Sequence, residues 1–367
     1  MDKELFVKLV STPSYGENVT NREQVVIDLI RDYIKKYLPN MKFYDDANTT
    51  IPYIFASANK KPDIIFACHA DTVPPSYENH LNPIYDGDRC IVLGGKDMKG
   101  GIASAIGALR SSLRNNAALL VYGDEEYNQL GILEMCKYIP RILLNPPRVI
   151  ICPESRFNLV YNSRGFSVFD IEIKGKKAHS ARPQSGIDAI NNFYEAFQVL
   201  EKKYSKLTKL GLTTFAISSI RGGVLEGNKI KCQPNVCSDI VRATISIRIS
   251  DYKMTGINYA RLLCSLLERK GLIVKINIKA DYPVRKTSNA IVKKMTNIAL
   301  KQCKQKLEIG EPALSGYNDA VILGKAIKSP VINFGPYGEK NHTPNEWVSM
   351  KSIEMTENIF KAWIEHI

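Results

Sequence analysis

Five residues are candidate ligands for divalent metal ions, because each has a metal-binding side chain and lies shortly after an apolar segment. They are two histidines and three carboxylates, namely His69, Asp97, Glu126, Glu154 and His342. Such nitrogen and oxygen ligands suit zinc, with cobalt or manganese as alternatives, and are too hard for copper(I) or an iron–sulfur cluster. One catalytic zinc ion needs fewer ligands, whereas five ligands serve two ions when one carboxylate bridges them. Two ions about 3.5–4 Å apart can activate one water molecule and polarise one carbonyl.

The first of these residues has an acidic neighbour at a spacing that suits a strand. Residues 64–67 are apolar and predict a buried strand. His69 and Asp71 follow two positions apart, so an extended chain places both on one side. Open α/β sheets bind ligands at the carboxyl ends of their strands, where this pair falls. Taken alone, the pair is equally compatible with a loop exposed to water.

Another ligand ends a run of three acids, Asp124-Glu125-Glu126, which follows the apolar segment 117–122. Adjacent carboxylates can point to opposite sides, so that one binds metal while the other faces the attacking water. A carboxylate without a metal bond in that position is suited to shuttle a proton. The alternative interpretation is a solvated helix start, because acidic residues favour helix N-termini.

The elements that must position these residues fall into two patterns. Apolar strands alternate with helices up to residue 164, and helical character returns at 290–305, which predicts an α/β domain with a mainly parallel sheet. Between them, 166–173 alternates apolar and polar residues, as an antiparallel strand with one wet face does. A helix, two strands, a helix and a strand follow at 188–202, 213–220, 238–249, 259–270 and 272–278.

This β-α-β-β-α-β order is typical of a ferredoxin-like α+β module. We therefore expect a catalytic domain made of residues 1–164 and 281–367. The smaller domain, residues 165–280, would be inserted into it.

A series of motifs extends along nearly the whole chain. In order, they are His69 to Pro74, Asp97 to Gly101, Asp124 to Glu126, Pro153-Glu154, Lys177 to Ser180 with Pro183 and Gly186, Gly222-Gly223 with Asn228 and Pro234, Gly316 to Ala320, and His342 to Glu346. In these motifs the chain resembles the di-zinc amidohydrolases and peptidases that include acetylornithine deacetylase, succinyl-diaminopimelate desuccinylase, the LysW-lysine hydrolases, carnosinase and tripeptide aminopeptidase. Val92 stands where the family commonly has a first glycine before the aspartate that bridges the metal ions.

The resemblance implies how the ligands divide between two metal ions. Asp97 would bridge the ions. Glu126 and His342 would complete one position, and His69 and Glu154 the other.

The resemblance also implies catalytic roles for three further residues. Asp71 would hydrogen-bond His69 and fix its tautomer and orientation. Glu125 would be the general base that carries a proton from water to the leaving amine. His179, in the smaller domain, would reach an active site, usually that of the partner subunit, and stabilise the oxyanion. A surface histidine in a Lys-Ala-His-Ser loop is the alternative for His179.

Substrate contacts are implied at four other positions. Arg248 matches a family arginine that meets a substrate carboxylate, a task that suits its planar fork, although a surface salt bridge is an equal alternative. Asn228 is a further contact by resemblance. Arg164 is either a hinge residue or a substrate contact. Gly316 would shape the floor of the pocket.

Composition restricts the partners and the compartment. The net charge is +13 and the pI about 9.2, which suits an anionic substrate or an acidic carrier protein. The lysines are scattered and not interleaved with aromatic residues, so we expect no nucleic-acid partner. The start of the chain lacks a signal-peptide layout and no apolar run approaches the ~20 residues that span a bilayer, so we expect a cytoplasmic protein without a membrane partner.

The sequence therefore predicts a cytoplasmic dinuclear zinc hydrolase of amino-acid biosynthesis that cleaves the amide bond of an N-acylated amino acid, for example in the arginine or lysine pathway. A di- or tripeptidase of the same fold is the enzymatic alternative. A metal-dependent binding protein without catalysis is the alternative of another class. The resemblance further implies a homodimer formed through the lid and dimerisation domain, residues 165–280.

Overall fold

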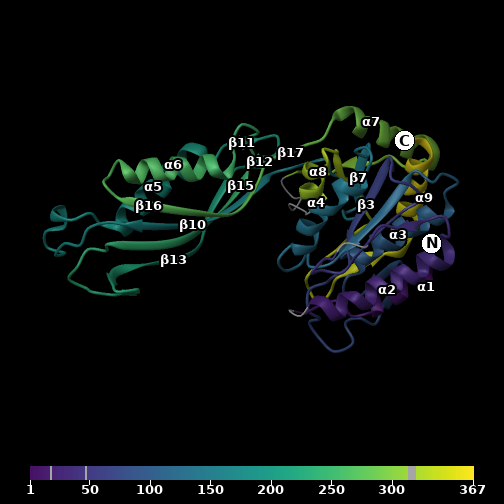
Figure 1. Cartoon of the computed structure of the whole chain (residues 1–367), viewed down its shortest axis with the longest axis horizontal. Helices are drawn as coiled ribbons and strands as arrows, with labels where there is room; N and C mark the ends of the chain where they lie inside the picture. The colour runs from purple at the N-terminus through teal and green to yellow at the C-terminus, as the bar shows by residue number, and fades with distance from the viewer. Residues whose placement is uncertain (17–18, 46–47, 313–319) are drawn as a thin grey trace. The chain divides into compact units, whose positions relative to one another are not determined.

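The computed structural model describes residues 1–16, 19–45, 48–312 and 320–367, which form two compact units (Figure 1). The first unit contains Met1–Tyr161, Lys286–Gly310 and the chain from 320 to Ile367, and the second contains Asn162–Arg285 with residues 311–312. Among these described residues, no helix is both long and apolar enough to cross a membrane. All eight cysteines are free.

The first unit is built on a mixed sheet with the strand order β1-β2-β6-β3-β7-β19. The central strands β6, β3, β7 and β19 are parallel, whereas β2 is antiparallel to both β6 and β1. The strands are β1 (Lys42–Phe43), β2 (Tyr53–Ser57), β3 (Ile64–His69), β6 (Ala117–Tyr122), β7 (Val149–Cys152) and β19 (Val331–Asn333).

The prediction of a mainly parallel sheet therefore holds at the centre and is wrong at one edge. Residues 58–63 alone join β2 to β3. A parallel crossover needs a dozen or more residues, so this short connection forces the two strands to run in opposite directions.

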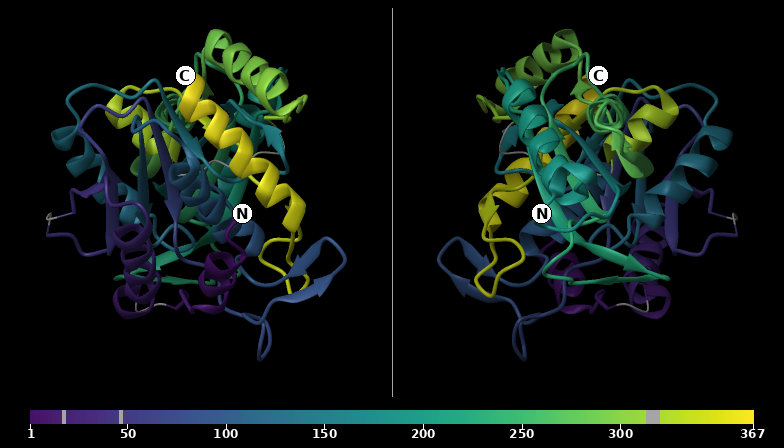
Figure 2. Two further views of the ribbon diagram at one scale, coloured as in Figure 1. Left: turned by 90° about the vertical axis from the view of Figure 1, so that its right-hand side faces the viewer. Right: turned by 90° about the vertical axis from the view of Figure 1, so that its left-hand side faces the viewer.

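Helices cover both faces of the sheet, as Figures 1 and 2 show. Helix α3 packs against α1 and α9, and α9 against α7, while α4 packs against α8 on the other face. The helices of this unit are α1 (Lys3–Ser11), α2 (Val19–Tyr37), α3 (Gly100–Ser111), α4 (Leu130–Ile142), α7 (Asn289–Cys303), α8 (Ala320–Ile327) and α9 (Met350–His366), with the π-helical turn η1 (Gly95–Lys99) before α3.

A second, four-stranded sheet joins distant parts of the chain beside η1. Its order is β20-β21-β5-β4, formed by Gly338–Glu339, Trp347–Ser349, Arg89–Ile91 and Ile84–Asp86. The backbone N–H of Val92 donates to the carbonyl of Glu346 at 3.1 Å. This pairing holds residues 340–346 next to the turn that carries Asp97. Short strands β8 (Asn158–Leu159) and β18 (Glu308–Ile309) form a separate parallel pair.

The second unit has the predicted β-α-β-β-α-β order around an antiparallel sheet, β14-β13-β15-β10-β16. In β10 every second residue is buried, and Phe169, Ile171 and Ile173 pack into one core with Phe193 and Leu263 of the two helices. The elements are β10 (Gly165–Lys174), α5 (Ala189–Tyr204), β13 (Thr214–Glu226), β14 (Lys229–Lys231), β15 (Ile240–Ile249), α6 (Gly256–Glu268) and β16 (Ile273–Tyr282), with the short elements β9 (Asn162–Ser163), η2 (Pro183–Ser185), β11 (Leu207–Thr208), β12 (Gly211–Leu212) and β17 (Arg285–Lys286).

Candidate metal centre

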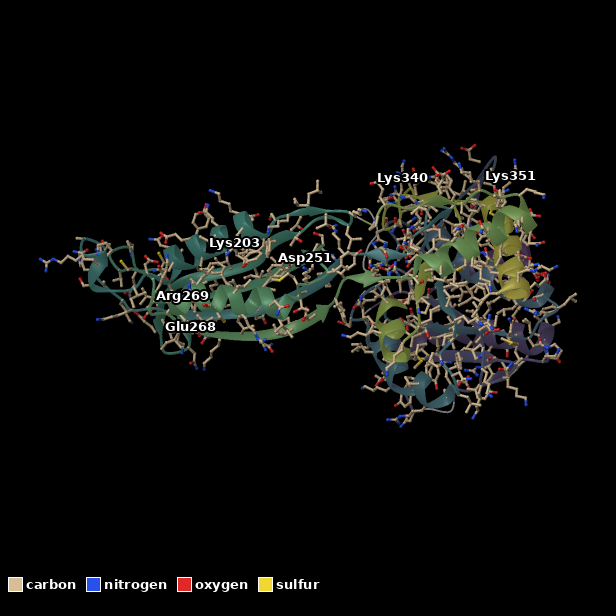
Figure 3. All side chains as sticks on the ribbon, turned by 90° about the horizontal axis from the view of Figure 1, so that it is seen from above. Lys203, Asp251, Glu268, Arg269, Lys340 and Lys351 are labelled. Carbon is tan, nitrogen blue, oxygen red and sulfur yellow. The ribbon has the colours of Figure 1, made fainter. Side chains whose placement is uncertain are left out.

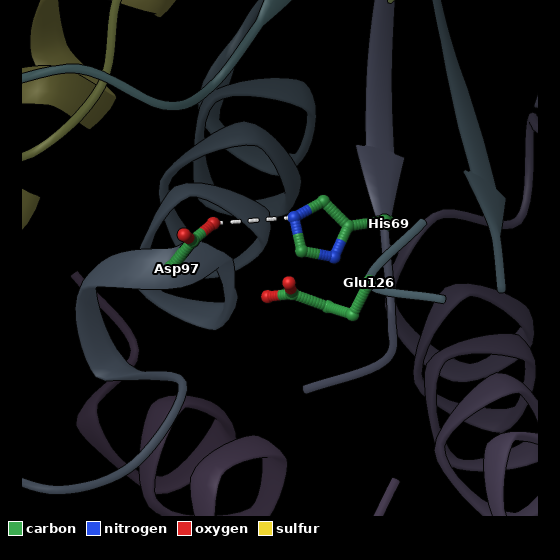
Figure 4. Close-up of side chains that lie close together, drawn as sticks. All are labelled: His69, Asp97 and Glu126. Atoms are coloured by element: carbon green, nitrogen blue, oxygen red, sulfur yellow. Dashed lines mark hydrogen bonds and ion pairs between the residues drawn. The ribbon is translucent and has the colours of Figure 1, made fainter. Parts of the chain in front are cut away.

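Three of the five predicted ligands come together at the carboxyl edge of the first unit's sheet (Figure 4). One ligand atom each of His69, Asp97 and Glu126 lies within 4.8 Å of the others. His69 is the last residue of β3, and Glu126 lies in the turn after β6. Because β3 and β6 are parallel neighbours, with His69 opposite Tyr122, their following residues meet at one edge.

The ring of His69 is held in one orientation by Asp71. Its Nδ1 lies 3.2 Å from the carbonyl oxygen of Asp71 and 3.4 Å from Oδ1 of the same residue. A carbonyl can only accept, so Nδ1 carries the donated proton, and Nε2 faces Oδ1 of Asp97 at 3.2 Å. Burial opposes a charge on this ring, but the bonds to Asp71 and Asp97 raise the pKa of His69 well above its usual value.

The fourth predicted ligand, His342, lies beside this group. Nε2 of His342 is 2.9 Å from Oε1 of Glu126 and 3.4 Å from Oδ2 of Asp97. These hydrogen bonds, first to Asp97 and then to Glu126, raise the pKa of His342 to about 10. Asn341, which the sequence analysis did not single out, donates to Oδ2 of Asp97 at 2.9 Å.

Asp97 is the carboxylate that both histidines approach. Burial disfavours its charge, but the hydrogen bonds from His342 and His69 outweigh burial and hold the pKa of Asp97 well below its usual range. Two imidazoles on two carboxylates form a compact nitrogen and oxygen donor set. This set fits a divalent ion such as zinc, whose charge would replace the protons on the imidazoles.

Glu154, the fifth predicted ligand, is paired with a cation of the chain. Its Oε1 lies 3.1 Å from the ammonium of Lys96, whose side chain is only 6% exposed. Burial opposes the charge of Lys96, and the carboxylates of Glu154 and Asp97 outweigh it, so the pKa of Lys96 rises. The sequence analysis did not single out Lys96, although it directly precedes Asp97.

Glu346 supports the turn that carries Asp97. Its Oε1 accepts the backbone N–H groups of Lys96 at 3.0 Å and of Asp97 at 3.1 Å. Burial and the nearby charge of Asp97 raise the pKa of Glu346 to about 7. Glu346 ends the motif that begins at His342, but its position in that motif did not predict a function for it.

The three acids after β6 have different surroundings. Asp124 is buried with φ of 63°, and its Oδ2 accepts from the backbone N–H of Leu130 at 3.0 Å, at the start of α4. This bond places Asp124 beside the first residue of α4, but Asp124 is buried and none of the three acids lies in the first turn of that helix, so the interpretation as a solvated helix start is wrong. Glu125 is half-buried and its charge contributes to the raised pKa of His69. A fourth acid, Glu23 of α2, accepts the N–H of Asp124 at 3.1 Å, and its pKa rises to about 8 through burial and the charge of Asp71.

The other predicted site residues belong to the second unit or lie outside the described residues. His179 is exposed, and its Nδ1 accepts the N–H of Ala181 at 3.1 Å. Asn228 is exposed in the turn between β13 and β14. A guanidinium nitrogen of Arg164 donates to the carbonyl of Leu212 at 3.1 Å. Gly316 falls in 313–319, outside the described residues.

Arg248, near the end of β15, stacks on an aromatic ring. Its guanidinium lies 4.1 Å from the ring centroid of Phe166, the residue opposite it in the sheet. Burial and the charge of Arg164 lower the pKa of Arg248. No ion pair of Arg248 is found within the described part of the chain, so the salt-bridge alternative has no support there.

Comparison with known proteins places the chain in a family. A family model described as peptidase family M20/M25/M40 matches residues 65–366. The chain belongs to the M20/M25/M40 family. It is 24% identical over 388 residues to the acetylornithine deacetylase of Buchnera aphidicola subsp. Schizaphis graminum, covering 99% of this chain and 96% of that protein. It is 25% identical over 383 residues to the succinyl-diaminopimelate desuccinylase of Nitratiruptor sp., covering 98% of each.

Solved structures of other proteins share the fold. The aminopeptidase PepT of Bacillus cereus matches with a TM-score of 0.73 at 19% identity, covering 98% of this chain and 96% of that one. The family membership identifies the chain as an enzyme, a metal-dependent hydrolase of amide bonds. The resemblance of the motifs to the family of acetylornithine deacetylase and succinyl-diaminopimelate desuccinylase is thereby confirmed.

Proposed function

We propose that this hydrolase removes the acyl group from a small N-acylated amino acid, using two zinc ions. The observation that carries the proposal is the convergence of His69, Asp97 and Glu126, with His342 beside them, at the carboxyl edge of the sheet. The two relatives that match along nearly their full lengths are named for deacylation of amino acids, which supports this substrate class.

Asp97 would be shared by the two ions, with Glu126 and His342 completing one position and His69 and Glu154 the other. Asp97 lies between His69 and His342, the position that a bridging carboxylate needs. When bound, the ions would supply Lewis-acid activation of water and of the scissile carbonyl.

The proton transfers are assigned to side chains of this chain. Glu125 takes the proton from the attacking water and delivers it to the leaving amine. His179, whose Nδ1 accepts from Ala181, carries its proton on Nε2 when neutral and donates from there to the oxyanion. Asp71 holds His69 in the orientation that presents Nε2.

A carboxylate on the substrate would give the basic residues of the second unit a role as its binding partners. Arg248 is held flat against Phe166, which keeps its fork in a fixed plane for a carboxylate. Asn228, Arg164 and Gly316 are assigned as further substrate contacts. The net charge of +13 suits anionic amino-acid derivatives or an acidic carrier protein that bears the amino acid. We further assign a cytoplasmic homodimer formed through residues 165–280.

A zinc-reconstituted hydrolysis panel tests the proposal. The panel contains N-acetylornithine, N-succinyl-diaminopimelate, γ-glutamyl-linked lysine and simple di- and tripeptides. Hydrolysis of an N-acyl amino acid in preference to all peptides is the expected result. Preference for peptides would replace the proposal by the peptidase alternative. Zinc binding without any hydrolysis would favour the binding-protein alternative.

Replacement of the general base tests the mechanism on the same panel. Glu125→Gln removes the proton acceptor at nearly constant size, so hydrolysis should be lost while zinc stays bound. Glu308→Gln, at an exposed position, is the matched control and should hydrolyse like the wild type. Hydrolysis that survives Glu125→Gln with zinc bound would show that another group takes the proton.

A further inference from the structure

A buried ammonium group lies within the metal centre. The Nζ atom of Lys96 is 3.1 Å from Oε1 of Glu154, and the carboxylates of Asp97 and Glu346 also act on its charge. Lysine has three donors and no lone pair when charged, so it cannot be a metal ligand. Lys96 is therefore a counter-ion for Glu154 in a place where the proposed second zinc ion would need that carboxylate.

The lysine side chain is fixed by its surroundings. Its backbone N–H is held by Glu346 at 3.0 Å. Its stem packs against Gly338 in β20, where an added Cβ would lie 2.8 Å from Cγ and 2.9 Å from Cβ of Lys96. The stem thus fills the space that any larger residue at position 338 would take. The contacts at Cβ and Cγ restrict the directions in which the ammonium group can move away from Glu154.

We propose that Lys96 is an internal competitor for the second metal ion, so that the two metal positions of this chain are unequal. The first ion binds to Asp97, Glu126 and His342, which lie together without a competing cation among the described residues. The second ion must break the contact between Lys96 and Glu154 and then remain near an ammonium group. Like charges repel, and the repulsion is stronger in a partly buried site than in bulk water. This inference rests on the proposed metal-dependent function and adds the control of metal occupancy to it.

Zinc titration of matched variants tests the proposal. Zinc content after dialysis and competition with a chromogenic chelator give the stoichiometry and both dissociation constants. The wild type should retain one ion tightly and bind the second more weakly. Lys96→Met keeps the stem and removes the charge, so the second ion should bind about 10- to 100-fold more tightly, the range by which groups around metal ligands change affinity. Lys351→Met, at an exposed lysine (Figure 3), is the control and should match the wild type.

Two further variants keep the test decisive if Lys96→Met does not fold. Lys96→Arg keeps the positive charge, so the second ion should bind as weakly as in the wild type. Glu154→Gln should abolish the second ion and leave the first.

The proposal is overturned if the wild type binds two ions with equal affinity, if Lys96→Met leaves the second affinity unchanged, or if Glu154→Gln binds the second ion as the wild type does. Those results, obtained with an active enzyme, leave the proposed hydrolysis intact. Absence of all zinc binding by the wild type would instead remove both proposals.

Discussion

The backbone N–H of Glu126 donates a hydrogen bond of 2.9 Å to Oδ2 of Asp71. The same aspartate fixes His69 through its carbonyl oxygen, so one residue after β3 orients ligands from two neighbouring strands. The sequence analysis predicted a contact of Asp71 with His69 only. The bond to Glu126 shows that it also sets the position of the turn after β6.

Removal of the Asp71 carboxylate should therefore weaken metal binding. Asp71→Ala frees the turn of Glu126 and one side of His69, and zinc affinity should fall about 10- to 100-fold. Asp71→Asn keeps an oxygen that can accept the N–H of Glu126, so its zinc affinity should fall less. Chelator competition measures both values, with Asp86→Ala on the exposed strand β4 as the control. Equal affinities for Asp71→Ala and the control would show that the hydrogen bond to Glu126 does not position the ligand.

The strands around this site could be predicted because runs of apolar residues in the sequence indicate buried strands. Segments 64–67 and 117–122 are almost entirely apolar, and β3 and β6 are buried at every residue. The alternation at 166–173 predicted β10 for the opposite reason, since one face of β10 is less buried. An apolar run carries no information about strand direction, so the antiparallel β2 could not be inferred from it.

The contacts between loops could not be predicted from the sequence. Lys96 and Glu154 are 58 positions apart, and Glu346 reaches the N–H of Lys96 across 250 positions. A charged residue in a loop ordinarily indicates exposure to solvent, so nothing in the local pattern predicted that these groups are buried together. The chemistry of the side chains identified candidate ligands. Their sorting into one cluster and one ion pair depends on the tertiary structure.

Zinc uptake should release protons, because His342 must lose its proton to become a ligand. Its pKa is raised to about 10 in the metal-free protein, so it is protonated at pH 7 to 8. Zinc affinity should rise as the pH increases toward 10 and gain nothing more from this group above it. Calorimetry in buffers of different ionisation enthalpy counts the protons released. His342→Ala should release about one proton fewer, and an unchanged count would show that His342 is not deprotonated on binding.

A methyl group at Gly101 should destabilise the first unit. The position lies in the first turn of α3, and an added Cβ would meet the carbonyl oxygen of Pro153 at 1.9 Å, next to Glu154. Overpacking in a well-packed interior costs about 1–3 kcal/mol, and a backbone atom cannot move aside easily. Gly101→Ala should thus lower the free energy of unfolding, measured by urea denaturation, by this amount or more. Ser111→Ala, at the exposed end of α3, should change the free energy of unfolding by less than about 0.5 kcal/mol.

Loss of the His179 imidazole should slow catalysis without removing metal. The Ala181 N–H occupies Nδ1, so Nε2 is the atom free to donate to the oxyanion. Removal of one oxyanion donor costs about 10²- to 10³-fold in kcat. His179→Ala should show this loss with normal zinc content, whereas a surface histidine would leave kcat unchanged.

Mixed dimers reveal whose active site His179 serves. Glu125→Gln and His179→Ala subunits are each expected to be nearly inactive alone. If His179 acts in the partner's site, a dimer of one subunit of each kind contains one site with both Glu125 and His179, so mixing the two variants restores hydrolysis. If it acts in its own subunit, no complete site forms and the mixture stays inactive. Mixing with a doubly substituted chain, which cannot complement, provides the control.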